Sequence, residues 1–210
     1  MGILDTFMKN IRMPNGLFGR LLVRGMNKTH NERTNWGLSH VTILEDNIIL
    51  DIGCGGGRTI KKLASKAPRG KIFGIDISKD SVTVAENNNR KLVKEGKVEI
   101  KVAGVSDIPF VEGFFDLVTA VETHIYWPCL ETDLAEVLRV LRPGGVLLIV
   151  CGEYLGSRFD ERNISWANRI GMRLHTLDEF KNTLSGVGFV DVNVFEDDGK
   201  GWFCAIGKRM

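Results

Sequence analysis

Glycines crowd into one short stretch of this sequence, and their spacing suggests ligand binding. The apolar run IILDI at 48–52 leads into GCGGG at 53–57. Glycine has no Cβ and readily adopts positive φ, so its backbone can approach a ligand closely. A helix that starts directly afterwards would present free N–H groups and the positive end of its dipole to the same ligand. Because a tight turn alone needs fewer glycines, the stretch predicts a ligand-binding loop.

Apolar runs alternate with helical patterns along the chain, and these elements must hold the loop. The expected strands, seven in all, lie at 48–52, 71–76, 98–102, 115–121, 146–150, 189–195 and 202–207. Helices are expected at 58–66, 79–94, 133–141 and, after a T-x-x-E capping box, from Thr176 to about Gly186. Unbroken apolar runs suit parallel strands that are buried on both faces. We therefore expect a doubly wound α/β fold: a mostly parallel, Rossmann-like sheet with an antiparallel last strand and helices on both faces.

The first forty residues stand outside this alternation. The ranges 4–13 and 17–27 have the pattern of two short helices, broken at Pro14-Asn15-Gly16. We expect residues 1–40 to form a helical extension or lid and residues 41–210 to form the main domain. A second unusual segment, 152–175, is longer than a simple connection requires. Its side chains either shape a substrate pocket or pack on the surface.

Composition restricts the classes of partner. The chain has 210 residues, of which 43% are hydrophobic, and a formal net charge of +2, which favours neither nucleic acid nor an anionic membrane. Its four cysteines lie far apart without a C-x-x-C pair, so neither a metal site nor a disulfide framework is expected. We see no apolar run of about 18 residues and no secretory leader. A cytoplasmic protein is predicted, with its oligomeric state left open.

The glycine spacing favours one class of ligand. In the dinucleotide fingerprint G-x-G-x-x-G, counted from Gly53, the third glycine position holds Arg58. The stretch fits D-x-G-x-G-x-G instead, beginning at Asp51, and this resembles the first motif of the class I S-adenosylmethionine-dependent methyltransferases. The segments GIDIS at 74–78 and VLRVLRPGGVLLIV at 137–150 resemble later parts of the same family in the same order. The likeness covers roughly residues 47–150.

The resemblance implies a role for each residue of this edge. In the family, the first motif holds the methionine part of S-adenosylmethionine, and the matching residues here are Asp51, Gly53, Cys54 and Gly55. The acidic residue that ends the second strand binds both ribose hydroxyls, which implies Asp76, with Ile77 beside it. A carboxylate suits that role because it accepts two hydrogen bonds at once. Capping of the next helix by Asp76 is the alternative.

The segment VAGVSDIPF at 102–110 resembles the family's adenine-binding loop, with one departure. The family commonly has Gly-Asp where this chain has Ala103-Gly104. The nearest polar side chains are Ser106 and Asp107, and both are candidates for contact with the adenine amino group. Turn formation ahead of Pro109 would account for them equally well.

Candidate catalytic residues follow the fourth strand. A sulfonium is already a strong leaving group, so the implied methyl transfer chiefly needs alignment and a dry site. A base is needed only where the acceptor must lose a proton, and His124, with an ordinary pKa near 6.5, suits that task. Glu122 is a candidate for contact with the cofactor's amino group, and Tyr126 for lining the acceptor pocket together with Trp127. Packing of His124 and the aromatic rings onto the sheet is the alternative.

Together these features predict a methyltransferase that acts on a small molecule and resembles the ubiquinone and menaquinone biosynthesis group. The Asn/Asp-Pro-Pro-Tyr motif of the family's amino-methylating enzymes is missing, since VETH stands at 121–124. The atom that receives the methyl group stays open. Two alternatives are a non-catalytic module that binds S-adenosylmethionine or S-adenosylhomocysteine, and a nicotinamide-dependent reductase.

Overall fold

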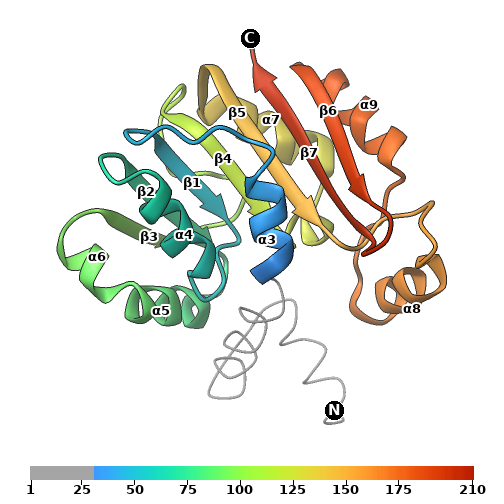
Figure 1. The fold of residues 1–210 in the computed structure, drawn as a ribbon, viewed down its shortest axis with the longest axis horizontal. Coiled ribbons are helices and arrows are strands. Elements are labelled where there is room, and N and C mark those ends of the chain that lie inside the picture. The colour runs from blue at the N-terminus through green and yellow to red at the C-terminus, as the bar shows by residue number, and fades with distance from the viewer. Residues whose placement is uncertain (1–30) are drawn as a thin grey trace.

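A seven-stranded sheet dominates the computed structural model, which describes residues 31–210 (Figure 1). Its strands are β1 (Ile48–Ile52), β2 (Lys71–Asp76), β3 (Val98–Val102), β4 (Phe115–Val121), β5 (Leu141–Cys151), β6 (Phe189–Asp197) and β7 (Trp202–Arg209). The order is β3-β2-β1-β4-β5-β7-β6, with β1 to β5 parallel and β7 antiparallel to both of its neighbours. The predicted doubly wound sheet with an antiparallel last strand is confirmed. This antiparallel strand, β7, lies between β5 and β6, so β6 forms the edge of the sheet.

Helices cover both faces of this sheet. They are α3 (Asn31–Leu38), α4 (Arg58–Lys66), α5 (Lys79–Asn88), α6 (Arg90–Lys94), α7 (Leu130–Val140), α8 (Asp160–Ile170) and α9 (Leu177–Val187), with a 3-10 turn at His124–Tyr126. Successive residues of a strand point to opposite faces. Ile49 of β1 therefore joins a core with α3, α4 and α5, while Leu50 joins a second core with α7 and α9.

Tertiary contacts explain where the helices depart from the predicted ranges. The helix expected over 79–94 is interrupted at Asn89, whose buried Nδ2 donates to the carbonyls of Gly57 and Ala85, both at 2.9 Å. The helix expected from 133 begins three residues earlier, at Leu130. There the carboxylate of Asp133 accepts a hydrogen bond from the N–H of Cys129 at 3.0 Å, which satisfies a donor at the helix start.

Two helices were not predicted. In α8, Asn163 is the one buried side chain, so the segment lacks the apolar stripe that would have revealed it. In α3, which lies in the predicted extension, Leu38 joins the same core as Ile49. The predicted helices at 4–13 and 17–27 lie outside the described residues. Among residues 31–210, none of the helices has the length and apolar character needed to cross a bilayer.

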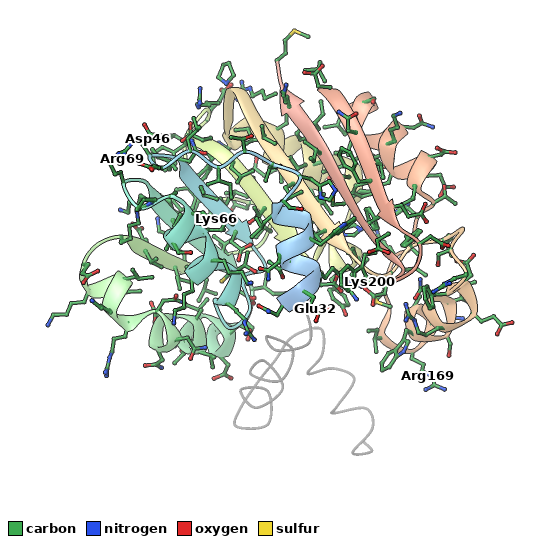
Figure 2. The ribbon with its side chains drawn as sticks, in the orientation of Figure 1. Glu32, Asp46, Lys66, Arg69, Arg169 and Lys200 are labelled. Atoms are coloured by element: carbon green, nitrogen blue, oxygen red, sulfur yellow. The ribbon has the colours of Figure 1, made fainter. Side chains whose placement is uncertain are left out.

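Charged side chains cover the outer surface, as the labelled Lys66, Arg69 and Arg169 illustrate (Figure 2). Lys200, in the connection from β6 to β7, lies with its Nζ 3.9 Å from a carboxylate oxygen of Glu32. Exposed pairs of this kind contribute at most about 1 kcal/mol. The position of α3 on the sheet therefore depends mainly on its buried residues.

We predict that Asn89→Ala lowers the free energy of unfolding by about 1 to 3 kcal/mol, because it removes two buried hydrogen bonds. Asn87→Ala is the matched control: this exposed asparagine of α5 donates to the carbonyl of Thr83 one turn earlier. Its change should stay within about 0.5 kcal/mol. Chemical denaturation measures both, and equal losses would contradict the role assigned to Asn89.

Candidate functional site

The predicted binding residues gather at one edge of the sheet. Because β1, β2, β4 and β5 are parallel, their carboxyl ends share this edge. The glycine loop follows β1, Asp76 ends β2, Glu122 follows β4, and Glu153 follows β5. Open α/β sheets bind their ligands in the crevice outside such strand ends.

Three glycines of the loop have positive φ: Gly53 (66°), Gly55 (51°) and Gly57 (74°). A Cβ at Gly53 would collide with the side chain of Thr123, and one at Gly57 would collide with Asn89 and Ala85. A Cβ at Gly55 would meet no atom within 4 Å. Packing therefore requires glycine at two of these positions, while Gly55 faces open space in which a ligand could approach the backbone.

Cys54 has a different orientation from its neighbours. Its side chain is buried and joins the core with Ile60 and Ala85, and burial raises the pKa of its thiol well above the ordinary value. Only the backbone of Cys54 is thus available to a ligand at the loop.

Asp76 connects the glycine loop to the end of β2. Its Oδ2 accepts from the N–H of Gly55 at 2.9 Å, and its Oδ1 accepts from the N–H of Ser78 at 2.8 Å. Ser78, and not Asp76, is the N-cap of α5, because its side chain accepts from the N–H of Ser81. Burial raises the pKa of Asp76, and the two backbone donors oppose that rise. Each carboxylate oxygen keeps a lone pair for a further donor.

Exposed apolar side chains lie beside this carboxylate. Ile77 is 51% exposed and Val102 is 55% exposed. Val102 is the register partner of Asp76 on β3, and a Cβ at Gly104 would lie 3.4 Å from Ile77. The edge therefore combines a hydrogen-bond acceptor with an apolar surface.

Asp51 lies at the base of the loop, where it is 2% exposed. Its Oδ1 accepts from the hydroxyl of Thr119 on β4 at 2.8 Å. Burial raises the pKa of Asp51 to about 7, which the hydrogen bond from Thr119 partly opposes. This carboxyl group links β1 to β4 directly beneath the glycines.

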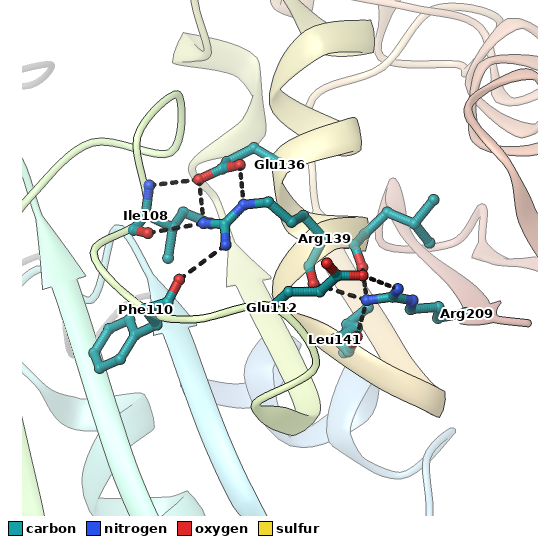
Figure 3. Close-up of polar contacts among 8 residues, drawn as sticks. Ile108, Phe110, Glu112, Glu136, Arg139, Leu141 and Arg209 are labelled. Atoms are coloured by element: carbon teal, nitrogen blue, oxygen red, sulfur yellow. Dashed lines mark hydrogen bonds and ion pairs between the residues drawn. The ribbon is translucent and has the colours of Figure 1, made fainter.

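The loop after β3 is attached to α7 (Figure 3). Arg139 of α7 donates to the carbonyls of Ile108 and Phe110, and Glu136 accepts from the N–H of Ile108 at 2.9 Å. In the same loop the hydroxyl of Ser106 donates to the carboxylate of Asp133 in α7 at 2.6 Å, so its proton is already used in a hydrogen bond. Asp107 is exposed, and its contact with an adenine amino group stays a prediction.

His124 lies inside the protein, at 5% exposure. Its ring centroid is 5.0 Å from that of Phe180 and 5.7 Å from that of Phe203. Burial lowers its pKa to about 3, and its Nδ1 has no hydrogen-bond partner among residues 31–210. With so low a pKa the imidazole is a weak base, and its burial keeps it from an acceptor, so both features favour the packing alternative over proton removal. Tyr126, in the same 3-10 turn, is half-buried.

Two charged residues that were not predicted for the site, Arg33 and Glu153, also lie at this edge. Glu122 forms an ion pair with Arg33 of α3, and Glu153 lies close to both. Arg33, Glu122 and Glu153 are far apart in the chain, so no local pattern connects them. The one sequence feature nearby is Gly152, where a Cβ would collide with the Arg33 guanidinium.

Comparisons with known proteins agree with this geometry. Residues 49–145 match the family model described as "Methyltransferase domain". An O-methyltransferase, cnsE of Penicillium expansum, is 37% identical over 101 residues, which are 48% of this chain and 36% of the relative. A demethylmenaquinone methyltransferase of Symbiobacterium thermophilum is 31% identical over 112 residues, which are 53% of this chain and 45% of the relative. The chain thus spans less than half the length of each of these curated relatives.

The fold likeness extends further than the sequence likeness. The structure of geranyl diphosphate C-methyltransferase from Streptomyces coelicolor A3(2), in complex with Mg²⁺, geranyl-S-thiolodiphosphate and S-adenosyl-L-homocysteine, has a TM-score of 0.73 and 14% identity. The alignment covers 86% of this chain and 76% of that one. The sheet topology described above agrees with this methyltransferase fold, and residues 49–145, just under half of the chain, match the methyltransferase domain model.

Proposed function

We propose that this chain binds S-adenosylmethionine at the carboxyl edge of the sheet and transfers its methyl group to a small-molecule acceptor. The observation that carries the proposal is the hydrogen bond from Gly55 to Asp76, beside exposed Ile77 and an open loop backbone. This arrangement offers one acceptor for sugar hydroxyls, one apolar surface for a base, and one bare main-chain segment.

The residues present fit the parts of that cofactor. Asp76 would accept from the two ribose hydroxyls through the lone pairs that its backbone donors leave free. Ile77 and Val102 would contact the adenine ring, with Asp107 as the exposed polar group nearby. The backbone from Gly53 to Gly55 would contact the methionine part, supported from beneath by Asp51.

When bound, S-adenosylmethionine supplies a methyl group on a sulfonium, which needs little activation. The chain's own task is then to position the donor and to exclude water from the site. The buried side chains of His124 and Trp127 pack the turn after β4 onto the protein interior. Any proton removal from the acceptor is better assigned to an accessible group than to His124.

A small-molecule acceptor is supported by the relatives' names. They include O-methyltransferases and a demethylmenaquinone methyltransferase, and the similar structure is that of a geranyl diphosphate C-methyltransferase. These names support neither the non-catalytic module nor the nicotinamide-dependent reductase. We also propose a cytoplasmic location without a nucleic-acid partner, which agrees with four free cysteines and a formal net charge of +2.

Asp76→Ala should weaken the binding of S-adenosylhomocysteine by about 1.5 to 3 kcal/mol, because it removes charged acceptors from two hydroxyl donors. Titration calorimetry measures the change. Asp46→Ala is the control, since this exposed carboxylate precedes β1 at the opposite end of the strand. Unchanged affinity in a folded Asp76→Ala protein would refute the ribose assignment.

Gly55→Ala tests the open loop separately from backbone strain. Gly96 is its match, because it also has positive φ (72°) and a Cβ there would likewise meet no atom within 4 Å. Each alanine should cost about 1 to 2 kcal/mol of stability for the left-handed conformation. Only Gly55→Ala should also lower affinity for S-adenosylhomocysteine, by more than about tenfold, since its methyl group occupies the space assigned to the ligand. Equal affinities in the two variants would contradict the proposed contact.

A further inference from the structure

An ion-pair cluster lies where β4 and β5 end, and it includes Glu122, the candidate for contact with the cofactor's amino group. Arg33 of α3 pairs with Glu122, and its Nη1 is 3.8 Å from Oε2 of Glu153. The side chains of Arg33, Glu122 and Glu153 are 16%, 8% and 24% exposed. The Sγ of Cys151 lies 3.4 Å from the same oxygen of Glu153, to which it donates.

Backbone features hold this cluster in place. Gly152 leaves room for the Arg33 guanidinium, whose Cζ also lies 5.6 Å from the ring centroid of Trp202. Glu122 adopts a φ of 60°, which is unusual for a residue with a side chain. Because α3, β4, β5 and β7 all contribute, the three charged groups meet only in the folded protein.

The cluster has one more acidic group than it has cations. With both carboxyl groups ionised its net charge is −1, and with one proton bound its net charge is zero. Burial, with Glu122 close by, raises the pKa of Glu153 to about 7, while Arg33 and Cys151 act in the opposite direction. Burial also raises the pKa of the Cys151 thiol, which therefore stays neutral. The cluster can accordingly gain or lose one proton near neutral pH.

This cluster adjoins the glycine loop. Thr123 follows Glu122 directly, and its side chain fills the position where a Cβ at Gly53 would stand. The cluster thus flanks the loop on the β4 side, while Asp76 flanks it on the β2 side. A positive charge held at the loop would be stabilised more strongly by the ionised cluster than by the protonated one.

We propose that Glu153 makes this site sensitive to the charge of the cofactor. Its carboxyl group releases a proton to the solvent when the sulfonium form binds, and it keeps that proton when the uncharged thioether product binds. The inference rests on the proposed function, since it needs both forms to bind at the loop. It makes Glu153 a positioning residue that favours the methyl donor over the spent product.

The test compares the dissociation constants of S-adenosylmethionine and S-adenosylhomocysteine at pH 6 and pH 8. In the unmodified protein, the affinity ratio in favour of S-adenosylmethionine should rise with pH, on the order of tenfold. The sign follows from linkage: below pH 7 the sulfonium must displace a proton, and above pH 7 the site is already ionised. Glu153→Gln should remove this added rise.

Comparison of variants separates Glu153 from other groups that titrate nearby. Asp51 has a pKa of about 7 as well, and the amino groups of the two ligands also titrate. These groups change the affinity ratio with pH by the same amount in the unmodified protein and in Glu153→Gln, so the difference between the two proteins belongs to Glu153. Glu86→Gln, at an exposed position of α5, is the charge-matched control and should keep the full rise. If Glu153→Gln does not fold, Glu153→Met has a similar length and brings no buried amide.

The outcomes separate a failure of this inference from a failure of the proposed function. A ratio that does not change with pH in the unmodified protein overturns the inference, as does a rise of equal size in folded Glu153→Gln. Both results would leave the proposed function intact, because both ligands would still bind. If neither ligand binds at any pH, the proposed function fails and the inference fails with it.

Discussion

The hydrogen bond from the N–H of Gly55 to the carboxylate of Asp76 is the interaction on which the binding edge depends. It joins the loop after β1 to the end of β2. It also holds the Asp76 carboxylate next to Gly55, where the backbone carries no side chain. Asp51 supports the same loop from beneath through Thr119, and Asn89 holds its far end through Gly57. Three strands (β1, β2 and β4), the helix α5 and the glycine loop are thus joined into one surface, which favours precise positioning of a ligand.

Much of this fold could be predicted from the sequence, because buried parallel strands give unbroken apolar runs. The bounds of β1, β2, β3 and β4 agree with the predicted ranges, as do those of α4. The break at Asn89 could not be predicted, since it depends on a contact with Gly57 that is distant in the chain. The helix α8 was missed for a related reason: it buries Asn163, whose Nδ2 donates to the carbonyl of Tyr154, and not an apolar stripe.

The candidate site divides in the same way. The positions of the glycine loop and of Asp76 at the carboxyl edge could be predicted, because each lies next to the strand that positions it. Arg33 and Glu153 could not, because only the folded sheet brings them to Glu122. For His124, the residue type suggested a role that its surroundings disfavour. Histidine is a common proton acceptor, but burial next to Phe180 and Phe203 lowers its pKa to about 3. Residue type alone does not reveal which side of a turn faces the solvent.

A crystal structure of the protein with S-adenosylhomocysteine is the most direct test of the central claim. We expect the ribose hydroxyls within hydrogen-bonding distance of the Asp76 carboxylate, and the amino-acid end of the ligand against the backbone from Gly53 to Gly55. A ligand bound away from this edge, or an edge left empty at saturating ligand, would contradict the account.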